Sequence, residues 1–219
     1  MDLATLERRL VAAVSPRDLL THPFYQAWSC GALTREDLRG YAAQYQHQVD
    51  ALPALLQSAM ASANDGATRD ALARNLADEV GGVPHAQLWR QFAEGLGSPR
   101  SEAAHQETLE SAEQLAALAG EGDVTALAAL WAYEMQTARV AKTKREGLSE
   151  FYGLCDQRSV AFFNLHESLD VHHARELLEA VARACGNDET KIQQACDAAA
   201  RSAAAQWRFL DGAEARRAA

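Results

Sequence analysis

Apolar residues recur along most of this chain with the period of an α-helix, and short runs of Gly, Pro, Asn or Asp separate the periodic segments. No stretch shows the alternation typical of a half-buried β-strand over a useful length. The pattern predicts an all-α protein, a bundle of about eight helices in one domain over residues 1–219. The expected helical ranges are 3–14, 22–31, 34–63, 67–80, 84–94, 101–118, 124–146, 159–184 and 187–219.

Some helix ends follow from local chemistry. Thr34 is a candidate N-cap, with Asp37 three residues later, for a long helix that Pro53 is expected to kink. Gly147 is expected to end a later helix, because glycine interrupts helical periodicity.

The segment 159–178 carries polar residues on an otherwise apolar helix face. His166, Asp170 and His173 stand at i, i+4 and i+7, so they share one side of the helix with Phe162. Burying two imidazoles and a carboxylate costs several kcal/mol unless something pairs them. A metal ion is the simplest partner, since neutral imidazole and carboxylate both bind iron, manganese or zinc. Taken alone, the three residues are also compatible with satisfied core and surface histidines.

Two further segments show the same conflict. Glu134 lies in an apolar stripe, Glu79 continues a leucine face, and His85 follows a Gly-Gly break that can turn the chain back toward Glu79. Helical bundles with two metals in the core use inward-facing Glu and His in about these numbers. Three carboxylates without a nearby thiolate suit iron or manganese better than structural zinc, so we expect a redox-active site. The candidate metal ligands are Glu79, His85, Glu134, His166, Asp170 and His173.

Composition and charge exclude several classes of function. The formal net charge of −9 argues against a nucleic-acid surface, and the most basic run, 142–145, is too short to bind one. No apolar run is long enough to cross a membrane, and the N-terminus lacks a signal-peptide pattern. The four cysteines lack paired spacing and are expected to be reduced thiols, with Cys155 buried and inert. We therefore expect a soluble, cytoplasmic protein.

Four motifs together resemble a known family. They are HPFYQAW, DE followed by H-x-x-LW, YE-x-Q-x-x-x-V-x-x-x-K-x-x-GL, and FF-x-x-H-x-x-x-D-x-x-H. Over residues 20–180 the chain resembles the haem-oxygenase-like dimetal oxygenases. Within them it is most similar to the branch of the chlamydial death-domain-associating protein and its bacterial relatives, which make para-aminobenzoate for folate synthesis. Thiaminase II and pyrroloquinoline-quinone synthase are related branches, but a thiaminase needs a nucleophilic cysteine near the position of Glu134.

The resemblance implies a haem-oxygenase-like bundle that binds two metal ions, Fe/Fe or Fe/Mn, through the six residues named above. It also implies O2 as co-substrate, an external reductant, an electron donor of unknown identity and a homodimer. In the para-aminobenzoate branch the enzyme consumes one of its own tyrosines, which falls here on Tyr25, and a lysine, which falls on Lys144, supplies the nitrogen. Accessory tyrosines fall on Tyr41 and Tyr133.

At two positions the residue roles that the family resemblance implies do not carry over directly to this chain. A further family tyrosine is Phe162 here, which removes any radical relay at that place. Lys144 follows Glu134 by ten residues, about 15 Å along a straight helix. The helix must unwind, or a neighbouring segment must bring substrate and lysine together, and Lys142 is a competing candidate.

Two alternatives remain open. One is a dimetal oxygenase that acts on an external small molecule, such as an amino acid or a fatty acid. The other is a non-catalytic interaction protein whose helical surface binds partner helices and for which the metal residues are dispensable.

Overall fold

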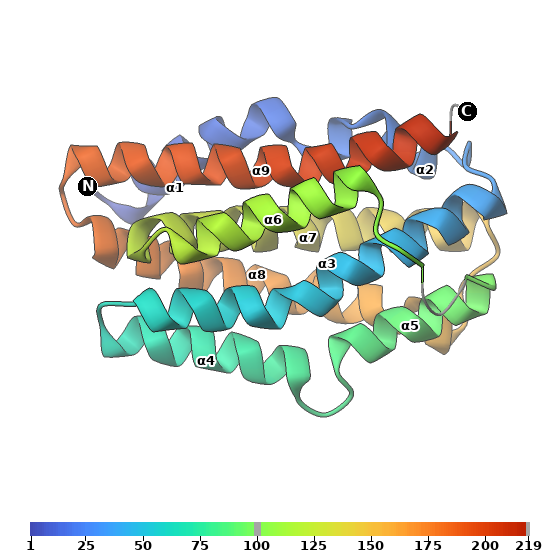
Figure 1. The fold of residues 1–219 in the computed structure, drawn as a ribbon, viewed down its shortest axis with the longest axis horizontal. Coiled ribbons are helices and arrows are strands. Elements are labelled where there is room, and N and C mark those ends of the chain that lie inside the picture. The colour runs from blue at the N-terminus through green and yellow to red at the C-terminus, as the bar shows by residue number, and fades with distance from the viewer. Residues whose placement is uncertain (99–101, 218–219) are drawn as a thin grey trace.

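The computed structural model describes residues 1–98 and 102–217, and these residues form nine α-helices and no β-strand (Figure 1). Two short 3-10 turns, Ser15–Arg17 and Leu19–Thr21, connect the first two helices. The predicted all-α bundle is confirmed. The helices are α1 (Leu3–Val14), α2 (Pro23–Ser29), α3 (Arg35–Ser62), α4 (Gly66–Val80), α5 (His85–Leu96), α6 (Gln106–Gly120), α7 (Asp123–Phe151), α8 (Gln157–Cys185) and α9 (Glu189–Arg217).

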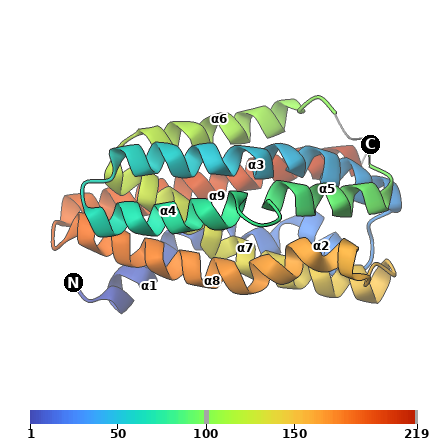
Figure 2. The same cartoon turned by 90° about the horizontal axis from the view of Figure 1, so that it is seen from below.

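Helix α7 is the centre of the bundle. Its first three turns are buried almost all round, and it packs mainly against α8 and α9. Helix α3 packs against α4, α5 and α6, while α4 and α5 run end to end along one edge (Figures 1 and 2). The two short helices α4 and α5 therefore take the place of one long helix, and the break between them lies beside α8.

The predicted start of α3 is confirmed. The Thr34 hydroxyl accepts from the backbone N–H of Asp37, and the Asp37 carboxylate accepts from the backbone N–H of Thr34, a reciprocal capping box. Pro53 lies inside this continuous helix.

The prediction that Gly147 ends a helix is wrong, because α7 continues to Phe151. Gly147 instead lets α2 approach α7. A Cβ at this position would lie 2.8 Å from Cδ1 of Trp28, whose indole N–H donates to the Lys144 carbonyl at 3.1 Å. The glycine serves close packing there.

The predicted helix over 101–118 begins later than expected. Ser101 lies outside the described residues, and residues 102–105 are not helical. The Gln44 side chain binds this segment by donating to the carbonyl of Ala103 and accepting from the N–H of His105. These bonds hold the backbone extended until α6 begins at Gln106.

Within the described residues, every helix is too short or too polar to cross a bilayer.

Candidate metal centre

Four helices around the break between α4 and α5 supply the six candidate ligands. Glu79 lies in the last turn of α4, and His85 is the first residue of α5. Gly82, with φ of +50°, turns the chain between them. Glu134 comes from the middle of α7, while α8 supplies the remaining three residues. All six are at most 4% exposed.

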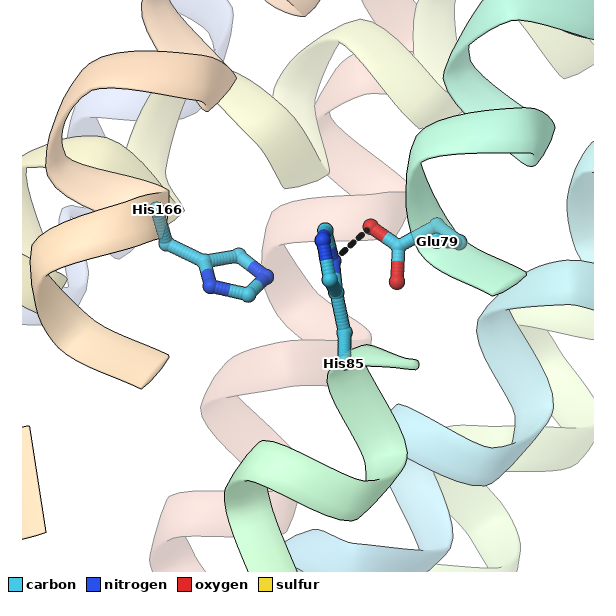
Figure 3. A group of neighbouring side chains, drawn as sticks. All are labelled: Glu79, His85 and His166. Carbon is cyan, nitrogen blue, oxygen red and sulfur yellow. Dashed lines mark ion pairs between the residues drawn. The ribbon is translucent and has the colours of Figure 1, made fainter. Parts of the chain in front are cut away.

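The first group is formed by Glu79, His85 and His166, each of which offers a ligand atom within 4.8 Å of the others. Figure 3 shows the His85 ring between the other two side chains, with its Nδ1 2.9 Å from Oε1 of Glu79. The Nδ1 of His166 lies 2.8 Å from the carbonyl of Phe162. Because a carbonyl only accepts, Nδ1 carries the proton and Nε2 keeps a free lone pair.

The second group is formed by Glu134, Asp170 and His173, again with ligand atoms within 4.8 Å of one another. The Nε2 of His173 lies 3.1 Å from the Asp78 carboxylate, which accepts a hydrogen bond from the Nε2–H. The Nδ1 lone pair then faces Glu134, 3.9 Å from Oε1. Both α8 histidines are therefore held in a tautomer suited to metal binding.

The buried polar atoms that lack a hydrogen-bond partner in these groups fit a bound metal ion. Both carboxylate oxygens of Asp170, Nδ1 of His85 and Nδ1 of His173 are buried without a hydrogen-bond partner among the described residues. His85 and Glu79 are close together but are not aligned for a hydrogen bond. Buried polar atoms are rarely left unsatisfied. Convergent lone pairs from oxygen and imidazole nitrogen suit iron or manganese.

Electrostatics in the absence of a cation disfavour charge in both groups. Burial, together with the neighbouring Glu79, raises the pKa of Glu134 to about 8. Burial, with the nearby carboxylates, raises the pKa of Asp170 well above its usual range. Burial and the adjacent His85 lower the pKa of His166 to about 3. Burial thus favours the neutral forms of Glu134, Asp170 and His166, and a bound cation would favour the charged carboxylates.

Two supporting residues were missed by the reasoning from sequence. Asn75 donates to Oε1 of Glu134 at 2.9 Å, and Asp78 orients His173. The signal for Asn75 was its position one turn before Glu79 on the buried face of α4. Asp78 is half-exposed and adjacent to Glu79, so its sequence context carried no comparable signal.

A small cavity of about 10 Å³ adjoins both groups. Its volume is that of one water-sized molecule. Phe162 lines the cavity and stacks on His166, with ring centroids 3.9 Å apart. Among the described residues that line it, the phenols belong to Tyr45 and Tyr133.

Lys144, Tyr25 and Tyr41 form a separate buried cluster. The Lys144 Nζ donates to the Tyr41 hydroxyl at 2.5 Å, and the hydroxyls of Tyr41 and Tyr25 are 2.7 Å apart. Burial lowers the pKa of Lys144 well below its usual value and raises the pKa values of both phenols. The competing candidate Lys142 is exposed. Burial therefore favours a neutral amine beside two protonated phenols.

Helix α7 stays regular between Glu134 and Lys144. The neighbouring helices α2 and α3 place Tyr25 and Tyr41 beside Lys144. Tyr133 lines the cavity at the metal groups and also a second small cavity beside Tyr25.

The cysteines take no part in this centre. All four are free, and the expectation that Cys155 is buried is wrong, because it lies exposed in the loop between α7 and α8.

Comparisons with known proteins give the family. Residues 39–207 match a family described as iron-containing redox enzymes of haem-oxygenase type. A 4-aminobenzoate synthase of Chlamydia muridarum is 37% identical over 85% of this chain and 82% of its own length. A 4-aminobenzoate synthase of Nitrosomonas europaea is 34% identical over 95% of this chain and 90% of its own length.

Solved structures share the fold. A TenA homologue of Pseudomonas syringae superposes with a TM-score of 0.83 at 18% identity, covering 98% of this chain and 96% of the other. A CADD-like protein of unknown function from Nostoc punctiforme gives 0.80 at 17% identity, covering 98% and 97%. At these identities the likeness concerns the fold alone. With the family match over more than half of its length, the chain belongs to the haem-oxygenase-like, iron-containing redox enzymes and is an oxidoreductase.

Proposed function

We propose that this protein is a 4-aminobenzoate synthase that activates O2 at two metal ions and consumes its own Tyr25, with Lys144 as the source of nitrogen. The observation that carries the proposal is the contact between these two residues. The Lys144 nitrogen lies 4.9 Å from the centroid of the Tyr25 ring, and both side chains are buried. Relatives named 4-aminobenzoate synthase support the product.

Glu79, His85 and His166 would hold one ion, and Glu134, Asp170 and His173 would hold the other. When bound, iron or an iron–manganese pair supplies O2 reduction and the oxidising power for the reaction. Asp78 and the Phe162 carbonyl fix the histidine tautomers, and the apolar shell excludes water from the site.

The residues around Tyr25 prepare it for reaction. The hydrogen bond between the Tyr41 and Tyr25 hydroxyls orients the Tyr25 phenol, and burial favours its protonated form. Burial keeps the Lys144 amine neutral, and only a neutral amine has the lone pair needed to attack carbon. Oxidation of the ring is what makes it open to that attack.

The test is a single-turnover reaction of purified protein with Fe(II), with and without Mn(II), reductant and O2, and no added aromatic compound. We expect at most one 4-aminobenzoate per chain and loss of mass from the peptide that contains Tyr25. Protein labelled with 15N-lysine should give 15N-labelled product.

The decisive variant is Tyr25→Phe, which removes one hydroxyl and should keep the fold and the metal but yield no product. Lys144→Arg should also yield none, whereas Lys142→Arg, at an exposed position, should behave as wild type. An intact Tyr25 peptide after product has formed would contradict the proposal and favour an external substrate. The homodimer and the electron donor stay predictions.

A further inference from the structure

Tyr45 contacts the cluster of Lys144, Tyr25 and Tyr41 from one side. It follows Tyr41 by one turn of α3, and the two rings stack with centroids 5.5 Å apart and an angle of 17°. The Lys144 nitrogen lies 4.6 Å from the Tyr45 centroid, which is shorter than its distances to the rings of Tyr25 and Tyr41. Tyr45 is therefore one of the aromatic rings that enclose the Lys144 nitrogen.

The same side chain reaches the metal groups on its other side. Tyr45 lines the 10 Å³ cavity together with Glu79, Glu134 and Asp170, and Tyr133 lines the same cavity. It also lines the neighbouring 20 Å³ cavity with Tyr25. Tyr45 thus spans the gap between the two sites.

The other aromatic residues at the metal cavity do not combine a hydroxyl with a stacked contact to the cluster. Phe162 lines the metal cavity but has no hydroxyl, and an unsubstituted benzene ring is much harder to oxidise than a phenol. Tyr133 lines both cavities, but among the described residues no ring contact joins it to Tyr41, on which the Tyr45 ring stacks. A continuous set of phenols thus leads from the metal cavity through Tyr45 and Tyr41 to Tyr25.

We propose that Tyr45 is the relay residue through which the metal centre, once oxidised by O2, withdraws an electron from Tyr25. The inference rests on the proposed function and names a residue that nothing in the family resemblance assigns. Its basis is a stacked ring pair on one side and a shared cavity with three carboxylates on the other.

The step balances as the loss of one hydrogen atom from Tyr25. The electron passes through Tyr41 and Tyr45 to the metal centre, which is reduced by one electron. The proton crosses the Tyr25–Tyr41 hydrogen bond and is first taken up by the Lys144 amine, 2.5 Å from the Tyr41 oxygen. Because burial disfavours the charged amine, the proton then passes to solvent before the neutral amine attacks the oxidised ring. Tyr41 and Tyr45 each regain the proton and electron that they lose, so both are unchanged.

The first experiment compares Tyr45→Phe with Tyr152→Phe. Tyr152 is a matched control, because it packs on Trp28 and lines neither cavity. Tyr45→Phe keeps the stacked ring and should keep the helical circular dichroism and the metal content of wild type. We expect at least about tenfold less 4-aminobenzoate and an intact Tyr25 peptide. Tyr152→Phe should match wild type. Undiminished product from Tyr45→Phe would overturn the inference.

A second experiment does not depend on product. Replacing Tyr45 by 3-aminotyrosine keeps the hydroxyl but makes the ring easier to oxidise, so an electron hole that reaches position 45 should stay there. After reduction and exposure to O2, electron paramagnetic resonance should show an aminotyrosyl radical, and Tyr25 should remain intact. The same replacement at Tyr152 should give no such radical. No radical at 45, or equal radicals at both positions, would contradict the relay.

The two proposals fail in different ways. If wild type makes no 4-aminobenzoate but the radical forms at position 45, the proposed product is wrong and the relay stands. If wild type makes the product and Tyr45→Phe does so equally well, the relay is wrong and the proposed function stands.

Discussion

Lys144 is the residue whose environment is least expected for its type. It is 3% exposed, and in the described part of the chain aromatic rings surround its nitrogen without a carboxylate to pair with it. A buried lysine without a counter-ion loses its proton, because the low-dielectric interior disfavours the charged form. The fold therefore carries an energetic cost at this residue, which fits a chemical role better than a structural one.

This cost depends on pH in a predictable direction. The pKa of Lys144 is lowered in the folded state, so between that pKa and the ordinary value of about 10.4 the unfolded chain binds more protons. Wild-type stability from this group therefore rises with pH, by up to about 1.36 kcal/mol per pH unit. Lys144→Met removes this titrating group. The free energy of unfolding of Lys144→Met minus that of wild type, measured with urea, should therefore fall from pH 7 to pH 9. The exposed control Lys142→Met should run parallel to wild type. Parallel curves for Lys144→Met would mean that Lys144 stays charged.

At the scale of single elements, α2 and α7 meet where α7 lacks a side chain. Ala is a better helix former than Gly by about 1 kcal/mol, so Gly147→Ala should stabilise an isolated helix. In this bundle the new Cβ would overlap Trp28, and overpacking costs about 1–3 kcal/mol. We expect Gly147→Ala to lower the free energy of unfolding. Gly40→Ala, on α3 with open space around the new Cβ, should raise it. Urea unfolding of both variants checks the opposite signs, and stabilisation by both would refute the packing role.

Much of the element structure could be predicted because helix ends are often local. The Thr34–Asp37 capping box needs only residues three apart, and its prediction is confirmed. The two wrong boundaries depended on residues far away in the sequence. Trp28 requires the glycine at 147, and Gln44 holds residues 103–105 out of a helix. Such tertiary contacts override local propensity, and a single sequence does not reveal them.

At the scale of the whole molecule, the candidate centre exists only where α4, α5, α7 and α8 meet. Its six residues could be chosen from sequence because each is polar on an apolar stripe. Their division into two groups could not, since His166 joins α4 and α5 while Asp170, one turn later, joins α7. The bridging position of Tyr45 was equally hidden, because it depends on how α3 crosses α7. Periodicity shows which face is buried, and the packing of helices decides what that face meets.

The same assembly predicts that Asp170→Asn will change stability in opposite directions with and without metal. Both Asp170 oxygens are buried without partners, beside Glu134 and Glu79. In metal-free protein the raised pKa of Asp170 means that folding disfavours its charged form, a cost that a neutral Asn does not carry, so the variant should unfold at higher urea than wild type. With saturating Fe(II) the order should reverse, because wild type gains binding free energy that the variant loses with a ligand. Metal analysis should show at least one equivalent fewer in Asp170→Asn. A variant that binds as much metal as wild type, or is less stable than wild type in both states, would remove Asp170 from the metal centre.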